Sequence, residues 1–148
     1  MSLVVVDASV AAKWFLPENG EALADRALAL LDQYDKKEVQ FVVPDLFYVE
    51  IASAIWKAVR VGRVPRAFGD QALVLLTQRE FATVPSLKLL DSAFQIATAY
   101  GRSVYDSLYV ALAVQTNSQL VTADERLANS LAAHFPVNWL GAIKNLIQ

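Results

Sequence analysis

Four acidic residues occupy positions at which a parallel α/β protein usually places its chemistry. Asp7 directly follows the apolar run 3–6, and Asp124 comes just after the short run 120–122. Both runs have the length and composition of short strands, and open parallel sheets bind ligands beyond the carboxyl ends of their strands. We therefore expect Asp7 and Asp124 to contribute to one site at that edge of a sheet.

The other two acids, Glu50 and Asp106, lie inside helix-like stretches that are otherwise largely apolar. A buried, unpaired charge costs several kcal/mol or gives up its ionisation, so each carboxylate needs a partner. Carboxylates with no cysteine or histidine beside them suit Mg²⁺, because hard divalent cations prefer oxygen ligands. Zinc would be expected to draw in nitrogen or sulfur ligands, and His134 is the only histidine of the chain.

Charge counting favours one or two such cations. Four converged carboxylates bring four negative charges, and two divalent ions neutralise them so that a phosphate can approach. Two ions about 3.5–4 Å apart activate a water and stabilise the leaving oxygen in phosphodiester hydrolysis. The sequence therefore predicts a metal-dependent phosphodiesterase site built from Asp7, Glu50, Asp106 and Asp124.

Each acid also has a structural interpretation. Asp7 and Asp124 both precede a predicted helix, and aspartate is a preferred N-cap residue. Asp106 stands three residues after Ser103, in the S-x-x-D pattern of a capping box. Glu50 has apolar or small residues three and four positions away, so its alternative is a salt bridge to a distant arginine.

The elements that must position these acids alternate between short strands and longer helices. This alternation predicts an α/β fold with crossover connections and a parallel sheet. Gly62 is placed as a helix C-cap glycine, and Pro65 as the first residue of the next helix. The predicted strands span residues 3–6, 41–43, 81–84, 120–122 and 137–139, and the predicted helices span residues 9–15, 21–34, 46–61, 65–78, 87–100, 104–116 and 125–134.

Composition limits the remaining possibilities. The 148 residues, 55% of them hydrophobic, fit a single domain that spans residues 1–148. The chain has no cysteine, so a disulfide framework is excluded and a reducing compartment fits. No uncharged window approaches the roughly 20 residues of a membrane-spanning helix, so we expect a soluble, cytoplasmic protein with no membrane partner. The net charge of −2 excludes a polycationic nucleic-acid coat but not a nucleic-acid enzyme.

Together, the four acidic motifs resemble those of the PIN-domain ribonucleases. The motifs are Val-Val-Val-Asp7-Ala-Ser9-Val, Tyr-Val-Glu50-Ile-Ala, Tyr-Asp106-Ser-Leu-Tyr and Leu-Val-Thr122-Ala-Asp124, and they follow the family's order over nearly the whole chain. In length and layout the chain is similar to the VapC-type toxins of toxin–antitoxin pairs.

The resemblance implies a PIN-like α/β/α domain with a central, mostly parallel sheet of about five short strands. It also implies an endoribonuclease that depends on Mg²⁺ or Mn²⁺, forms a homodimer and is neutralised by a cognate antitoxin protein. By position, Asp7, Glu50, Asp106 and Asp124 would be the catalytic metal ligands. Ser9 and Thr122 match small hydroxyl positions that support these ligands or contact the substrate. Hydrolysis of RNA would leave a 5′-phosphate and a 3′-hydroxyl.

Basic residues offer candidate contacts to the RNA backbone. Four of them recur every three residues, a pattern that is typical either of a solvated face or of a path for phosphates. Arg102 precedes the Asp106 motif and can meet either a phosphate or a site carboxylate, and Lys13 is a further candidate. Most of the aromatic residues, Tyr109 included, are predicted to pack in the core. The four recurring residues are Lys57, Arg60, Arg63 and Arg66.

Two other functions fit parts of the pattern. The first is phosphoryl transfer through an aspartyl-phosphate at Asp7, as in haloacid-dehalogenase-like phosphatases or receiver domains. The Asp-x-Asp opening of those phosphatases is here Asp7-Ala8-Ser9, and the paired acids that end the first strand of a receiver domain are absent. The second is a non-catalytic PIN-like module that serves as a platform for RNA or protein. Metal binding followed by a nuclease assay separates these possibilities.

Overall fold

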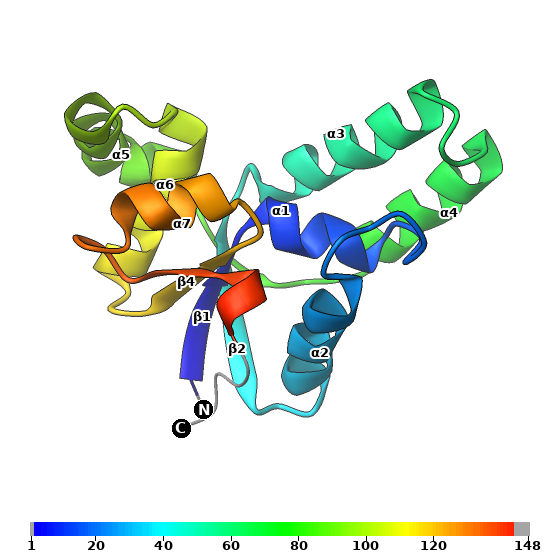
Figure 1. The fold of residues 1–148 in the computed structure, drawn as a ribbon, viewed down its shortest axis with the longest axis horizontal. Helices are drawn as coiled ribbons and strands as arrows, with labels where there is room; N and C mark the ends of the chain where they lie inside the picture. The colour runs from blue at the N-terminus through cyan, green and yellow to red at the C-terminus, as the bar shows by residue number, and fades with distance from the viewer. Residues whose placement is uncertain (1, 144–148) are drawn as a thin grey trace.

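Five parallel strands form one sheet in the computed structural model, which describes residues 2–143. Their spatial order is β3-β2-β1-β4-β5, and Figure 1 labels the three central strands. The chain moves outward from β1 through β2 to β3 and then returns to place β4 on the other side of β1. This reversal creates a topological switch point between β1 and β4, where open sheets bind their ligands. The strands span Ser2–Val6 (β1), Val39–Pro44 (β2), Ala82–Val84 (β3), Gln119–Thr122 (β4) and Val137–Trp139 (β5).

Helices cover both faces of the sheet, as right-handed crossovers require. Helix α2 lies against β2 on one face, and α6 packs on β1 and β2 from the other (Figure 1). Helices α3 and α4 run side by side and project beyond the sheet. No helix within residues 2–143 has both the length and the apolarity to cross a membrane. The helices span Ala8–Ala11 (α1), Ala24–Asp35 (α2), Phe47–Arg60 (α3), Arg66–Thr77 (α4), Ser86–Tyr100 (α5), Val104–Gln115 (α6) and Glu125–Leu131 (α7), with 3₁₀ turns at Ala12–Trp14 (η1) and Leu140–Ala142 (η2).

The core explains why the site strands are continuous apolar runs. Val5, Val6 and Val121 are fully buried, because β1 and β4 are central strands with helices over both faces. Helix α6 is also central, and every residue from 107 to 113 is buried between the sheet and α5. Asp106 stands one residue before this buried stretch, so the packing of α6 fixes where its side chain begins.

The predicted α/β fold is confirmed, and all five predicted strands are present. Three helices differ from their predicted bounds by three residues or more, and the other four by a single residue at one or both ends. The helix predicted to begin at residue 21 starts at Ala24, because Leu23 has a left-handed backbone with φ of 59°. The helix predicted to reach residue 134 ends at Leu131, where the chain closes into a turn in which the His134 and Phe135 amides both donate to the Leu131 carbonyl. The helix predicted over residues 9–15 is a short α1 that tightens into η1.

Candidate functional site

Asp7 is held by two hydroxyl groups at the carboxyl end of β1. Its Oδ2 accepts hydrogen bonds from Ser9 Oγ at 2.7 Å and from Thr122 Oγ1 at 2.8 Å, and the residue is only 7% exposed. Burial raises the pKa of the Asp7 carboxyl; the two hydroxyl hydrogen bonds oppose this shift and the charge of Asp106 adds to it. The arrangement thus keeps a desolvated acid in one fixed orientation.

The same hydroxyls fix the segment that follows β4. Ser9 Oγ accepts a hydrogen bond from the Ala123 amide at 3.0 Å, and Thr122 Oγ1 accepts one from the Asp124 amide at 3.1 Å. The Asp7 amide in turn donates to the Val121 carbonyl at 3.0 Å. Asp7 and Asp124 therefore belong to one hydrogen-bonded unit across the switch point.

Glu50 enters the site from the first turn of α3. Its Oε1 accepts a hydrogen bond of 2.7 Å from the hydroxyl of Tyr109 on α6. Burial raises the pKa of Glu50 to about 7, against the Tyr109 hydrogen bond, and the charges of Asp7 and Asp106 contribute to the rise. Three acids from three elements are therefore close enough for their charges to interact.

Arg102 connects the remaining two acids. Its Nη2 donates to Asp106 Oδ2 at 3.3 Å and to Asp124 Oδ2 at 3.5 Å. Asp106 lies in the first turn of α6, where Ser103 Oγ accepts a hydrogen bond from the Asp106 amide at 3.0 Å. In this structure the guanidinium meets site carboxylates, which is one of the two contacts that the sequence allowed for Arg102.

The structural interpretations account for part of this arrangement. Asp124 does cap α7, since its Oδ1 accepts a hydrogen bond from the Leu127 amide at 3.2 Å. Asp7 precedes α1, but its side chain makes no capping hydrogen bond. Glu50 is paired with a tyrosine hydroxyl and not with an arginine. Capping therefore explains the position of Asp124 and leaves Asp7 and Glu50 without a structural reason to be acidic.

The donor set suits a hard divalent cation. Every candidate ligand is a carboxylate or hydroxyl oxygen, and the raised pKa of Glu50 reflects burial together with the negative charges of Asp7 and Asp106. As the side chains stand, no three histidine, aspartate or glutamate residues within the described range are arranged to hold an ion. Arg102 engages Asp106 and Asp124, and Tyr109 engages Glu50, so these side chains would need to turn to bind metal.

Tyr109 is the site residue that sequence reasoning missed. It was expected to pack in the core, and at 1% exposure it does, but its hydroxyl holds Glu50. Its spacing was the available signal, because Tyr109 lies three residues after Asp106 and therefore on the same face of α6.

The basic residues at the end of α3 do not act as one group. Arg63 Nη2 pairs with Glu21 at 2.8 Å and donates to the Pro17 carbonyl at 3.2 Å. Lys13, itself only 9% exposed, pairs with the same Glu21 at 3.0 Å. Arg63 thus fastens the segment between η1 and α2 to the α3–α4 turn, and Lys13 fastens the same segment to η1.

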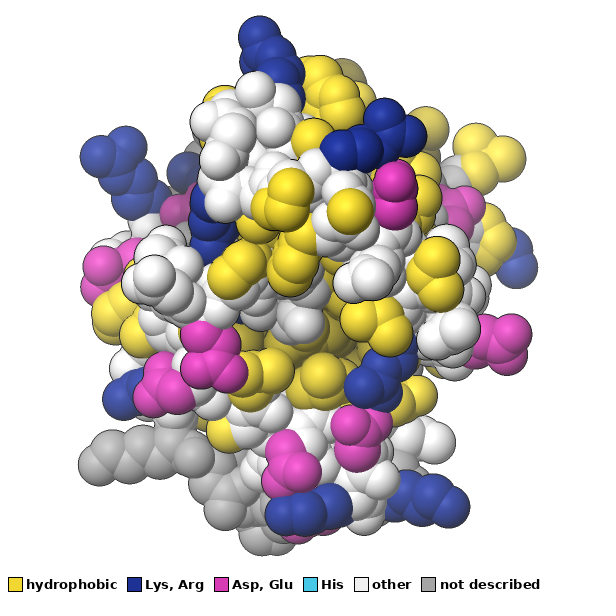
Figure 2. All heavy atoms as spheres, turned by 90° about the vertical axis from the view of Figure 1, so that its right-hand side faces the viewer, with side chains coloured by type: hydrophobic (Ala, Val, Ile, Leu, Met, Phe, Trp, Pro, Cys, Tyr) yellow, Lys and Arg dark blue, Asp and Glu magenta, His cyan; other side chains and the backbone are white. Residues whose placement is uncertain are grey.

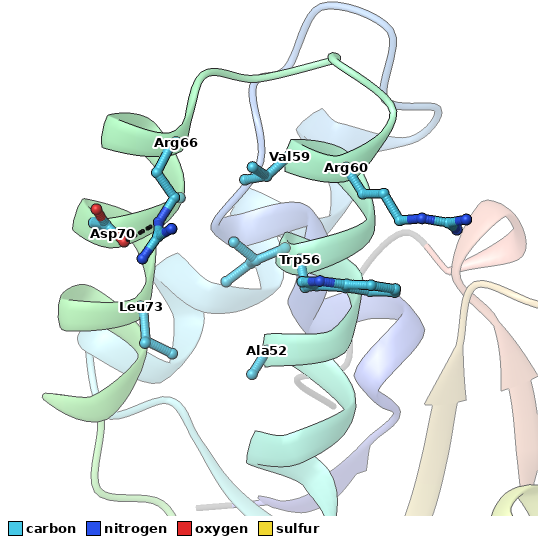
Figure 3. Close-up of a pocket in the computed structure, with 9 residues that line it drawn as sticks. Ala52, Trp56, Val59, Arg60, Arg66, Asp70 and Leu73 are labelled. Carbon is cyan, nitrogen blue, oxygen red and sulfur yellow. Dashed lines mark hydrogen bonds and ion pairs between the residues drawn. The ribbon is translucent and has the colours of Figure 1, made fainter.

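The other three of the four recurring basic residues are exposed. Arg66 on α4 pairs with Asp70 at 2.9 Å, whereas the guanidinium of Arg60 on α3 lies 5.5 Å from the centre of the Trp56 ring (Figure 3). Lys57 is exposed on α3. Of the four recurring basic residues, Lys57 and Arg60 are therefore the two that form no ion pair with a carboxylate among residues 2–143.

An apolar groove of about 570 Å³ lies between α3 and α4. Trp56 and Leu73 line it from opposite helices and are 59% and 45% exposed (Figure 3). The helices approach closely at Gly69, where an added Cβ would lie 2.6 Å from a methyl group of Val59. Seen from this side, hydrophobic side chains gather over the surface, with charged side chains around them (Figure 2).

Known proteins resemble this chain in both sequence and fold. The chain is 33% identical over 135 residues to Ribonuclease VapC3 of Pyrobaculum aerophilum, which covers 88% of this chain and 95% of that protein. It is also 33% identical to Ribonuclease VapC9 of Mycobacterium tuberculosis, over 91% of this chain and 96% of the relative. The crystal structure of PAE2754 from Pyrobaculum aerophilum matches with a TM-score of 0.64 and 25% identity, over 95% of this chain and 90% of the other.

A structure of VapBC2 from Rickettsia felis bound to a promoter DNA fragment matches with a TM-score of 0.60 over 93% of this chain and 98% of the other; at 11% identity it supports the fold alone. A family model of the PIN domain matches residues 4–130, a range that contains all four acids. The resemblance read from the motifs is confirmed, and the chain belongs to the PIN-domain family.

Proposed function

We propose that this protein is a Mg²⁺- or Mn²⁺-dependent endoribonuclease and the toxin of a toxin–antitoxin pair. The observation that carries the proposal is the convergence of four acids from separate elements: Thr122 Oγ1 donates to Asp7 and accepts from the Asp124 amide, and burial together with the charges of Asp7 and Asp106 raises the pKa of Glu50 to about 7. Arg102 links Asp106 to the fourth acid, Asp124. Two relatives, each 33% identical over most of the chain, are named ribonucleases, which supports RNA as the substrate.

In the proposed mechanism, the four carboxylates would hold the cation, and the surrounding side chains orient the carboxylates. When bound, a divalent cation activates a water for attack on phosphorus and stabilises the departing 3′ oxygen. Ser9 and Thr122 donate to the same oxygen of Asp7 and so fix its orientation. Tyr109 does the same for Glu50. No side chain needs to form a covalent intermediate.

The nucleophile of an aspartyl-phosphate mechanism would be Asp7, and its surroundings disfavour that role. Asp7 Oδ2 already accepts two hydrogen bonds, and the residue is almost fully buried. Position 9, where the phosphatases carry a second acid, holds a serine that donates to Asp7. The geometry therefore favours Asp7 as a ligand over Asp7 as a nucleophile.

Cleavage of a labelled single-stranded RNA tests this function. Metal-stripped protein should be inactive, and added Mg²⁺ or Mn²⁺ should restore cleavage that EDTA then stops. Asp106→Asn should abolish cleavage, whereas Asp70→Asn, which alters an exposed acid on α4, should not. Activity that persists in chelator would eliminate the metal mechanism. Metal binding without cleavage would instead indicate a non-catalytic PIN-like module.

We further propose that the groove between α3 and α4 receives an apolar segment of the antitoxin. Leu73 and Trp56 expose apolar surface there, and exposed apolar patches on soluble proteins mark binding sites. Leu73→Glu should weaken binding of the cognate antitoxin by at least about tenfold, because a charge would be buried in the complex. RNA cleavage by the free protein should be unchanged.

The proposed homodimer would use a different surface. Helix α5 exposes Leu87, Leu90 and Phe94, which recur at helical spacing on one face. Leu87→Glu should shift sedimentation from dimer to monomer and leave antitoxin binding unchanged. Leu73→Glu should do the reverse, so each variant is the control for the other. A wild-type protein that is a strict monomer at micromolar concentration would contradict the dimer.

A further inference from the structure

We propose that Arg102 is a built-in counter-ion that occupies the acidic site of the metal-free protein and must release Asp106 and Asp124 before a divalent cation binds there. The proposal concerns Arg102 as a positioning residue and rests on the proposed function only in assuming that these acids bind a cation. It makes metal binding and the release of an arginine two parts of one equilibrium.

The contacts of Arg102 are those of a shared and incomplete ion pair. One nitrogen, Nη2, serves both carboxylates, at 3.3 Å to Asp106 and 3.5 Å to Asp124. Arginine pairs that serve only to stabilise a fold are commonly bidentate and shorter. The Nε of Arg102 is buried and has no hydrogen-bond partner among the described residues. The guanidinium is therefore anchored to the acids by long bonds and has an unsatisfied donor in this position.

The location of Arg102 allows it to leave. It lies in the connection between α5 and α6, next to Gly101, whose φ is +70°. Its side chain is 23% exposed, so a route to solvent exists. Release therefore requires rotation of one side chain and no displacement of α6, which is packed in the core.

A divalent cation and Arg102 compete for the same oxygens. A cation held by Asp106 and Asp124 would need the carboxylate groups that Arg102 now contacts, and it would repel the positive guanidinium. Because binding of one excludes the other, Arg102 weakens the apparent affinity for metal. Its two contacts are long and partly exposed, so the coupling should be about five- to tenfold, near the lower end of typical linkage between sites.

Calorimetric titration with MgCl₂ or MnCl₂ alone tests the competition. Arg102→Gln should bind the metal about five- to tenfold more tightly than the wild type, and its metal-free form should melt at a lower temperature. Arg102→Lys, which keeps the charge, should bind with an affinity closer to that of the wild type. The charge-matched control is Arg126→Gln, because Arg126 is exposed on α7 near Asp124 and makes no ion pair with any residue from 2 to 143. Its affinity should change less than twofold.

A second measurement uses the wild-type protein and is independent of the folding of variants. The Nε–Hε NMR signal of Arg102, assigned by its disappearance in Arg102→Lys, should shift as Mg²⁺ is added, while that of Arg126 stays in place. Unchanged or weaker metal binding by Arg102→Gln, with a static Arg102 signal, would overturn the proposal and leave the nuclease function intact. Absence of metal binding in every variant would overturn both. Tighter binding without RNA cleavage would support the role of Arg102 and reject the nuclease.

Discussion

Tyr109 donates a 2.7 Å hydrogen bond to Glu50, so a residue in the core helix α6 orients an acid on the projecting helix α3. Burial raises the pKa of the Tyr109 hydroxyl well above its usual value, and the phenol therefore remains a donor at any working pH. The hydrogen bond therefore joins Glu50 on α3 to the buried helix α6, which also carries Asp106.

Removing this hydroxyl should change the acid and leave the fold in place. Tyr109→Phe deletes the hydrogen bond that lowers the pKa of Glu50, so that pKa should rise above about 7. Deleting the hydrogen bond should cost about 1 kcal/mol of stability. Carboxyl ¹³C titration of the metal-free protein measures the shift. The matched control is Tyr105→Phe, because Tyr105 lies on the same helix and is 65% exposed. An unshifted Glu50 would show that Tyr109 is only a packing residue.

Glu50 should make the stability of the metal-free protein depend on pH. Its pKa is raised from 4.5 to about 7, so between these values the folded state binds more protons than the unfolded chain. Stability must then fall as the pH rises through this window. Glu50→Gln should be more stable than the wild type at pH 8, and the difference should shrink toward pH 4.5. Thermal melts from pH 4.5 to 8.5 measure this.

Glu38→Gln is the control for the pH experiment, because Glu38 precedes β2 at the opposite edge of the sheet. Its difference from the wild type should not follow the same window. A Glu50→Gln difference that is constant with pH would refute the assignment.

Asp7→Asn should separate catalysis from folding. The asparagine oxygen can still accept the hydrogen bonds from Ser9 and Thr122, and the cost of burying a charge disappears. Without metal, stability should be unchanged or higher by up to about 2 kcal/mol, whereas RNA cleavage should be abolished. Chemical denaturation in EDTA at pH 8 measures the first effect. A large decrease in stability would indicate that Asp7 is there for structure.

The exposed cations of α3 should guide RNA without reading its sequence. Lys57→Ala combined with Arg60→Ala should weaken binding to all single-stranded RNAs alike and reduce the salt slope by roughly 0.7 for each phosphate that the variant no longer neutralises. Arg66→Ala is the control, since its charge is already paired with Asp70. Arg63 is a poor target because it holds Glu21. An unchanged salt slope would place the RNA path elsewhere.

Strong local patterns made the fold predictable. The runs 3–6 and 120–122 could be recognised as central strands because residues buried on both sides are apolar without alternation. Gly62 was correctly placed after a helix, and its φ of +77° is the backbone conformation that glycine adopts readily. Element bounds depended instead on tertiary contacts, as at Glu21, whose pairing with Lys13 and Arg63 accompanies a delayed start of α2.

The sequence predicted which acids form the candidate site, but it did not predict most of the side chains that pair with them. Asp7 and Asp124 could be placed together because parallel strands end at a common edge. The partner of Glu50 could not, because a tyrosine in an apolar helix has the same pattern whether or not its hydroxyl has a function. The pairing of Arg102 with Asp124 likewise could not be predicted, because the spacing of Arg102 from Asp106 fits a helix contact and says nothing of Asp124.

The return of the chain from β3 to β4 decides when the molecule becomes complete during synthesis. Thr122 follows its partner Asp7 by 115 residues, and a nascent chain that ends after β3 still exposes one edge of β1. Open strand edges pair readily with other chains, and N-terminal segments emerge first from the ribosome. Aborted translation products would therefore lack Asp106 and Asp124 and tend to misassemble. A function that needs all four acids would arise only in chains translated past Asp124.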